Sequence, residues 1–282
     1  MENTLTQRAN WPQILIQTKS NIQEQVARLL KTLRQPQPNL GIGAGGDPIR
    51  QIDLAAESAI INTLRKHKIS FTLISEESGV REYGKSPHEH YVTADPIDGT
   101  TNLMRGIPFC ATSIAVSTKS TLNSVHAALV ADLTHGTTYT AQKGRGAHRN
   151  NQRITPSRIT SLKEAVIGID LNAYGNQKII PQLAGLIRKT KHLRHFGANA
   201  LEMCYVADGT TDAFIDIRGK LRATDMAAAW LIIEEVDARI TSPDGKPLNI
   251  KLDPKQNVAF TASANQKIHK TILNLIRPQK GK

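Results

Sequence analysis

The chain has 282 residues, of which 39% are hydrophobic and 21% charged, as in globular proteins with a sizeable core. No run approaches the ~18 consecutive apolar residues of a membrane span, and the polar first ten residues lack the apolar stretch of a signal peptide, so we expect a cytoplasmic protein. The formal net charge of +12 is compatible with a multivalent anionic substrate or with a nucleic-acid partner, and much of it is expected to form a solvated face.

The N-terminal part of the chain is predicted to form two helices. Apolar residues recur at helical spacing up to Leu33, after a possible capping box at Ser20–Gln23, although Pro12 is also a suitable first-turn residue. A glycine-rich loop at 41–46 follows and leads to a second helix at about 53–66. The loop follows a proline-rich stretch and no strand, which argues against dinucleotide binding.

Strands and then an alternation of strands and helices make up the rest. Strands are predicted at 71–75, 91–95, 111–117, 124–132 and 137–141. After about residue 155, strands are predicted at 165–170, 213–217 and 258–261, and helices at 177–189, 198–207, 225–236 and 264–276. This pattern divides the chain into an α+β half, residues 1–155, and an α/β half, residues 156–282. Cys110 and Cys204 each lie in an apolar run and are predicted to be buried, reduced thiols.

The most specific segment is Asp95-Pro96-Ile97-Asp98-Gly99-Thr100-Thr101-Asn102. A strand brings Asp95 to its C-terminal end, and the proline and glycine that follow enforce a tight turn toward Asp98. Two carboxylates held so close repel one another unless a cation neutralises them, and a hard divalent ion can also accept the Ile97 carbonyl as a ligand. The amides of Gly99, Thr100 and Thr101 come next and predict an anion site beside the metal.

Two further carboxylates have the right setting to join this site. Glu76 follows a short predicted strand, and Asp225 opens the predicted helix 225–236. Taken alone, an acidic residue before a helix is usually a cap, and adjacent glutamates are usually surface residues. The signature at 95–102 strengthens the prediction that Glu76 and Asp225 are metal ligands.

These motifs resemble the inositol monophosphatase superfamily, whose signature is D-P-[IL]-D-G-T-T-N. The resemblance extends through Ser75–Ser78 and a second signature around Asp225, and so covers most of the chain. Three details are similar to its archaeal bifunctional branch, which hydrolyses fructose 1,6-bisphosphate and inositol 1-phosphate. They are Gly106-Ile107-Pro108-Phe109, Asp216-Ile217-Arg218-Gly219 with Leu221-Arg222, and Thr224 in place of tryptophan.

The resemblance implies an α/β fold, a layered αβαβα sandwich, in a homodimeric Mg²⁺-dependent phosphomonoesterase. It implies that one Mg²⁺ is held by Glu76, Asp95 and the Ile97 carbonyl, and a second by Asp95, Asp98 and Asp225. Asp53 and Thr100 would position the attacking water. Substrate contacts are implied for Asp98, Gly99, Thr100, Arg194, Asn199 and Arg218.

The glycine-rich loop departs from the archaeal pattern G-A-D-G-T-P-T. Here it reads Gly43-Ala44-Gly45-Gly46-Asp47-Pro48-Ile49, so a third metal linked to the loop aspartate is in question unless Asp47 substitutes. Two alternatives stay open. One is hydrolysis of 3′-phosphoadenosine 5′-phosphate or another small phosphate ester, although enzymes of that kind typically have a K-G-F-type segment after the signature and this chain has Thr101-Asn102-Leu103. The other is a phosphatase-like, basic nucleic-acid-binding protein, although the densest basic cluster, residues 188–195, has no aromatic residues for base stacking.

Overall fold

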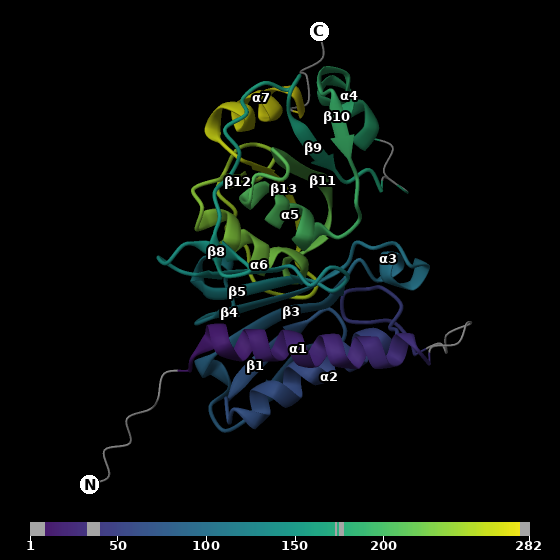
Figure 1. The fold of residues 1–282 in the computed structure, drawn as a ribbon, viewed down its shortest axis with the longest axis vertical. Helices are drawn as coiled ribbons and strands as arrows, with labels where there is room; N and C mark the ends of the chain where they lie inside the picture. The colour runs from purple at the N-terminus through teal and green to yellow at the C-terminus, as the bar shows by residue number, and fades with distance from the viewer. Residues whose placement is uncertain (1–8, 33–39, 173, 175–177, 277–282) are drawn as a thin grey trace.

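The computed structural model describes residues 9–32, 40–172, 174 and 178–276. Figure 1 shows five layers: a helix pair, a large sheet, a second helix pair, a smaller sheet and a third helix pair. The predicted αβαβα sandwich is therefore confirmed. Each sheet has helices on its faces, which explains why so many strand residues are buried and apolar.

The larger sheet has eight strands in the order β2-β1-β3-β4-β5-β6-β7-β8. Only β1 and β3 pair in parallel, and every other neighbouring pair is antiparallel. The strands are β1 (Phe71–Ser75), β2 (Gly79–Tyr83), β3 (Tyr91–Asp98), β4 (Ala111–Ser117), β5 (Val125–Asp132), β6 (Thr138–Gln142), β7 (Ala147–Arg149) and β8 (Gln152–Arg153).

The outer face of this sheet is covered by α1 (Trp11–Leu30) and α2 (Gln51–Lys66), which lie side by side in Figure 1. The expected capping box at Ser20–Gln23 is wrong. The alternative start at Pro12 is confirmed, because α1 begins at Trp11 with Pro12 in its first turn, and Ile14 and Leu15 are buried.

The smaller sheet has the order β10-β9-β11-β13-β12. Its strands are β9 (Val166–Ile169), β10 (His192–Arg194), β11 (Ala213–Arg222), β12 (Arg239–Thr241) and β13 (Asn257–Ser263). The helices α4 (Ile179–Lys189) and α7 (Gln266–Ile276) cover its outer face.

Between the sheets lie α5 (Asn199–Ala207) and α6 (Ala223–Glu234). Most of α6 is buried, because its apolar side chains contact strands of both sheets. One core cluster contains Val130 and Tyr139 of the first sheet together with Met226 and Phe260 from the second half. The two sheets therefore share a core, and α6 is buried between them.

Candidate metal centre

The parallel pair β1 and β3 ends in two acidic side chains. Ser75 is paired with Ala94, so Glu76 and Asp95 are the next residues on adjacent strands. Both are buried. The pairing of β3 with β4 is irregular between Asp95 and Asp98, where Pro96 cannot donate a ladder hydrogen bond. This bulge turns the chain so that the Ile97 amide donates a 3.1 Å hydrogen bond to Asp95 Oδ1.

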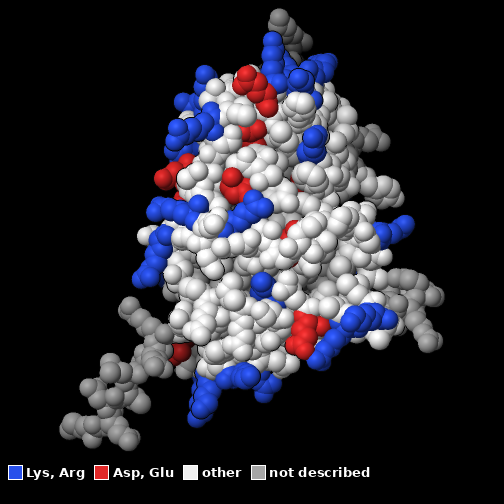
Figure 2. Space-filling model, in the orientation of Figure 1, with Lys and Arg blue, Asp and Glu red and all other residues white. Residues whose placement is uncertain are grey.

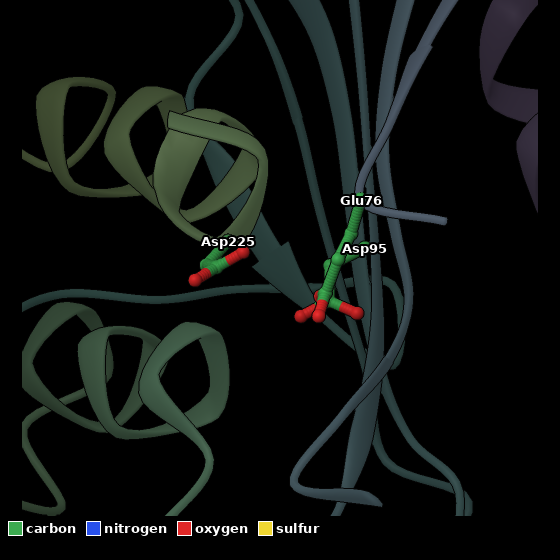
Figure 3. Close-up of side chains that lie close together, drawn as sticks. All are labelled: Glu76, Asp95 and Asp225. Carbon is green, nitrogen blue, oxygen red and sulfur yellow. The ribbon is translucent and has the colours of Figure 1, made fainter. Parts of the chain in front are cut away.

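The third carboxylate comes from the other half of the chain. Asp225 is the third residue of α6, where its Oδ2 accepts a 3.1 Å hydrogen bond from the Arg222 amide. Ligand atoms of Glu76, Asp95 and Asp225 all lie within 4.8 Å of one another. Figure 3 shows Glu76 and Asp95 pointing the same way from the sheet, with Asp225 facing them from the helix.

This cluster has the electrostatics of a cation site. Burial, and then the neighbouring Asp225, raise the pKa of Glu76 to about 9. Burial followed by the charge of Glu76 also raises the pKa of Asp95 well above its usual range. Buried carboxylates that repel one another are stabilised by a hard divalent ion with oxygen ligands, so the donor set fits the metal that the sequence predicts.

Asp98 lies beside the cluster and binds the start of α5. Its Oδ2 accepts a 2.7 Å hydrogen bond from the Ala200 amide. Burial, and then the charge of Asp225, raise its pKa to about 7. Gly99 follows with φ of +84°, and a Cβ there would lie 3.1 Å from Ala198 Cβ, so a side chain at this position would be both strained and crowded.

Asp53 and Thr100 meet although they are 47 residues apart. The Thr100 hydroxyl lies 3.4 Å from Asp53 Oδ1 and 2.9 Å from the Ile97 carbonyl oxygen, so it has two acceptors. Burial raises the pKa of Asp53 to about 7. The structure therefore brings together the two residues that the resemblance implies as a pair.

The residues predicted to contact the substrate lie in different surroundings. Arg218 is engaged by two buried carboxylates, with Nη2 2.6 Å from Asp216 Oδ2 and 2.5 Å from Asp170 Oδ2. Arg194 is exposed at the end of β10. Asn199 is the first residue of α5, and its buried Oδ1 has no hydrogen-bond partner within the described part of the chain.

Two further charged residues near the site, Arg222 and Glu202, were not among the predicted site residues. Arg222 reaches the carboxylates, with Nη1 2.8 Å from Glu76 Oε1 and Nε 3.3 Å from Asp225 Oδ2. Glu202 is buried in α5, and burial raises its pKa to about 8. The position of Arg222, three residues before Asp225, was the available signal, since helix geometry brings such residues together.

A profile of the inositol monophosphatase family matches residues 11–280. The chain belongs to the inositol monophosphatase family. It is therefore a metal-dependent phosphoric monoester hydrolase, and its substrate is a phosphate ester. This membership also explains why Asp95–Asn102, the segment most specific in the sequence, lies at the carboxylate cluster.

Three relatives illustrate the similarity. A fructose-1,6-bisphosphatase/inositol-1-monophosphatase of Methanothermobacter thermautotrophicus is 32% identical, covering 94% of this chain and 96% of that protein. A bifunctional NADP phosphatase/NAD kinase of Methanococcus maripaludis is 34% identical over 83% of this chain, which spans only 44% of that protein. The crystal structure of an inositol monophosphatase–fructose 1,6-bisphosphatase superposes with a TM-score of 0.82 at 29% identity, covering 95% of this chain and 100% of that one.

Most of the positive charge of the described residues lies on the surface, whereas the side chains of Arg218 and Arg222 are only 9% and 15% exposed. Lysine and arginine are prominent on the face in Figure 2, and none of those in the described ranges is fully buried. Eleven acidic residues of the described part of the chain are buried: Asp53, Glu57, Glu76, Asp95, Asp98, Asp132, Asp170, Glu202, Asp212, Asp216 and Asp225. The two cysteines are buried and free, as predicted, and none of the described helices is long and apolar enough to cross a membrane.

Proposed function

We propose that the chain is a Mg²⁺-dependent phosphatase of small phosphorylated sugars or polyols, with fructose 1,6-bisphosphate and inositol 1-phosphate as substrates. The observation that carries this proposal is the group of three buried carboxylates, Glu76, Asp95 and Asp225, within 4.8 Å of one another. The Methanothermobacter relative, named for both activities, supports the choice of substrates because it matches nearly the whole chain.

We propose that two ions share these carboxylates together with Asp98 and the Ile97 carbonyl. Glu76 and Asp95 with the Ile97 carbonyl would hold one, and Asp95, Asp98 and Asp225 would hold the other. When bound, the ions would neutralise the carboxylates, polarise the phosphoryl oxygens and lower the pKa of a coordinated water. All of these ligands are carboxylate or carbonyl oxygens, which suit Mg²⁺ better than a metal that prefers nitrogen or sulfur.

The chain's own part in the reaction would lie with Thr100 and Asp53. The Thr100 hydroxyl already has two acceptors, Asp53 Oδ1 and the Ile97 carbonyl. Through this pair, the protein can orient the attacking water and accept its proton. Asn102 supports the arrangement, since its side-chain amide donates to the carbonyls of Phe109, at 2.8 Å, and Phe196, at 2.7 Å.

A nucleotide substrate is the second candidate, because the Methanococcus relative is named as an NADP phosphatase. A panel of fructose 1,6-bisphosphate, inositol 1-phosphate, glycerol phosphate, NADP⁺ and 3′-phosphoadenosine 5′-phosphate tests both candidates. We expect phosphate release that requires Mg²⁺ and is greatest for the first two. Asp95→Asn is the negative control. Equal release in the presence of EDTA would overturn the metal assignment, and a strong preference for a nucleotide would replace the substrate assignment.

A further inference from the structure

Arg222 connects residues 40–48, which precede α2, to the carboxylate cluster. We name residues 40–48 the clasp loop. Its backbone lies on the turn that follows β1, because Gly45 N donates to the Glu76 carbonyl at 2.8 Å and Ala44 N to the Glu77 carbonyl at 3.1 Å. Ile42 and Pro48 close the loop through a β-bridge. The loop is thus anchored next to a residue predicted to bind metal.

Arg222 contacts the loop and the carboxylates with the same guanidinium. Nη1 lies 2.7 Å from Asp47 Oδ2, 2.8 Å from Glu76 Oε1 and 3.4 Å from the Gly45 carbonyl oxygen. Nε lies 3.3 Å from both carboxylate oxygens of Asp225. Arg222 therefore bridges two of the three clustered carboxylates and one exposed acid of the loop.

Gly45 provides the space for this arrangement. A Cβ at position 45 would lie 2.7 Å from Arg222 Nη1 and 2.8 Å from Glu76 Cγ, both too close for ordinary contact. A side chain at position 45 and the observed position of Arg222 therefore exclude each other.

The guanidinium neutralises the same oxygens that a divalent cation would need. Glu76 and Asp225 cannot give their full negative charge to an ion while Arg222 is bonded to them, and two cations side by side repel. Asp47 differs from these two acids, because its side chain is 69% exposed and belongs to the clasp loop. It offers Arg222 a partner outside the ligand set.

We propose that Arg222 is a positioning residue that competes with the divalent cation for Glu76 and Asp225 and retains its bond to Asp47 when the cation binds. This inference rests on the proposed function, since it concerns the same metal site. By linkage, cation binding then changes how firmly the clasp loop is held, and the loop changes cation affinity by the same factor.

A double-mutant cycle on Mg²⁺ affinity tests this competition. Calorimetric titration of Mg²⁺ without substrate gives the affinity directly, and Mn²⁺ binding followed by electron paramagnetic resonance gives an independent measure. We expect Arg222→Met to tighten Mg²⁺ binding about tenfold, because the competing charge is removed. Asp47→Asn should weaken binding about threefold in the wild-type background, because Arg222 loses its alternative partner.

The decisive result is the behaviour of Asp47→Asn in the Arg222→Met background. Competition predicts that its effect disappears there, since no guanidinium remains to be drawn away. Attraction of the ion by Asp47 through space predicts the same loss in both backgrounds, and that result would overturn the proposal. Weaker Mg²⁺ binding in Arg222→Met would also overturn it, because Arg222 would then order the ligands. Glu82→Gln, at an exposed acid that contacts His88, is the matched control and should leave the affinity unchanged.

Two further measurements keep the test decisive. If Arg222→Met does not fold, Arg222→Lys serves instead, because it keeps the charge but cannot bridge Glu76, Asp225 and Asp47 together. The effect of Asp47→Asn should then shrink, and an undiminished effect counts against competition. The variant Ile42→Trp, at a position that is 65% exposed, should change its fluorescence emission with Mg²⁺ only when Arg222 is present. Absence of divalent-cation binding in the wild type, or unchanged binding in Asp95→Asn, would instead refute the proposed function.

Discussion

The Ala200 amide donates a 2.7 Å hydrogen bond to Asp98 Oδ2, although the two residues are 102 positions apart. This bond joins the signature in the first half of the chain to the helix α5 in the second. Asparagine at position 98 can still accept it through its carbonyl oxygen, but it lacks the negative charge. Asp98→Asn should therefore abolish turnover and keep the fold, as measured by phosphate release at saturating Mg²⁺ and by circular dichroism. Near-normal turnover would remove Asp98 from the ligand set.

Removal of the Thr100 hydroxyl should affect the rate more than the metal. Thr100→Ala loses the contact with Asp53 and is expected to lower kcat by roughly 10²–10⁴, the range for lost proton-transfer help. Mg²⁺ affinity, measured by calorimetry, should change little. A parallel loss of Mg²⁺ binding would show that Thr100 supports the ligands and has no separate role with Asp53. Thr101→Ala, one residue further along α3 (Thr100–Arg105), is the matched control.

Variants of Arg218 can distinguish a structural role of this residue from a role in substrate binding. Arg218→Ala leaves Asp170 and Asp216 buried without their partner, which should cost about 3–5 kcal/mol of the free energy of unfolding. Urea denaturation measures this cost, and Asp170→Asn combined with Arg218→Ala should recover part of it.

Arg218→Lys is the better variant for kinetics, because it keeps a positive charge in place. If Arg218 binds a distal phosphate, this variant should lose more kcat/KM on fructose 1,6-bisphosphate than on inositol 1-phosphate. Equal losses would mean that Arg218 maintains the shape of the site.

His269, a buried histidine outside the metal centre, is expected to make the free energy of unfolding depend on pH. His269 of α7 contacts Thr241 Oγ1 at 2.9 Å and Ser263 Oγ at 3.1 Å, and burial followed by the charge of Arg239 lowers its pKa to about 4. The unfolded chain binds the proton more readily, near pH 6.5. The contribution of neutral His269 to the free energy of unfolding is therefore fully present above that pH and is lost as the pH falls toward 4.

The loss should reach roughly 2–3 kcal/mol near pH 4, a figure reduced for partial solvent screening. His269→Gln should flatten this part of the curve, because glutamine does not titrate. Urea unfolding of both proteins at pH 7, 6, 5 and 4 measures the difference. Curves with the same slope in both would show that other groups dominate.

The parts of the site predicted from sequence are those that local chemistry specifies. Residues 95–102 make their turn through their own proline and glycine, and strands 71–75 and 111–117 were predicted with the bounds that the structure has. For α1 the sequence offered two starts, Ser20 and Pro12, and it could not decide between them because the burial against the sheet that extends the helix back to Trp11 is a tertiary contact.

Other features depend on partners far along the chain. The short strands β7, β8, β10 and β12 exist because neighbouring strands offer hydrogen bonds, so their two or three residues carry little pattern of their own. Glu202 resembles a surface position in sequence, and only the fold shows that it is buried. The bridge from Arg222 to Asp47 spans 175 residues and has no local signal.

The core shared by the two sheets affects how the protein is made. All strands of the larger sheet lie before residue 155, yet the inner face of that sheet is covered by α5 and α6, which begin at Asn199 and Ala223. A nascent chain that has formed this sheet therefore presents Val130 and Tyr139 to water until the helices emerge from the ribosome. Apolar surface exposed in this way promotes aggregation. The chain is therefore expected to be most prone to aggregation in the interval before α6 emerges.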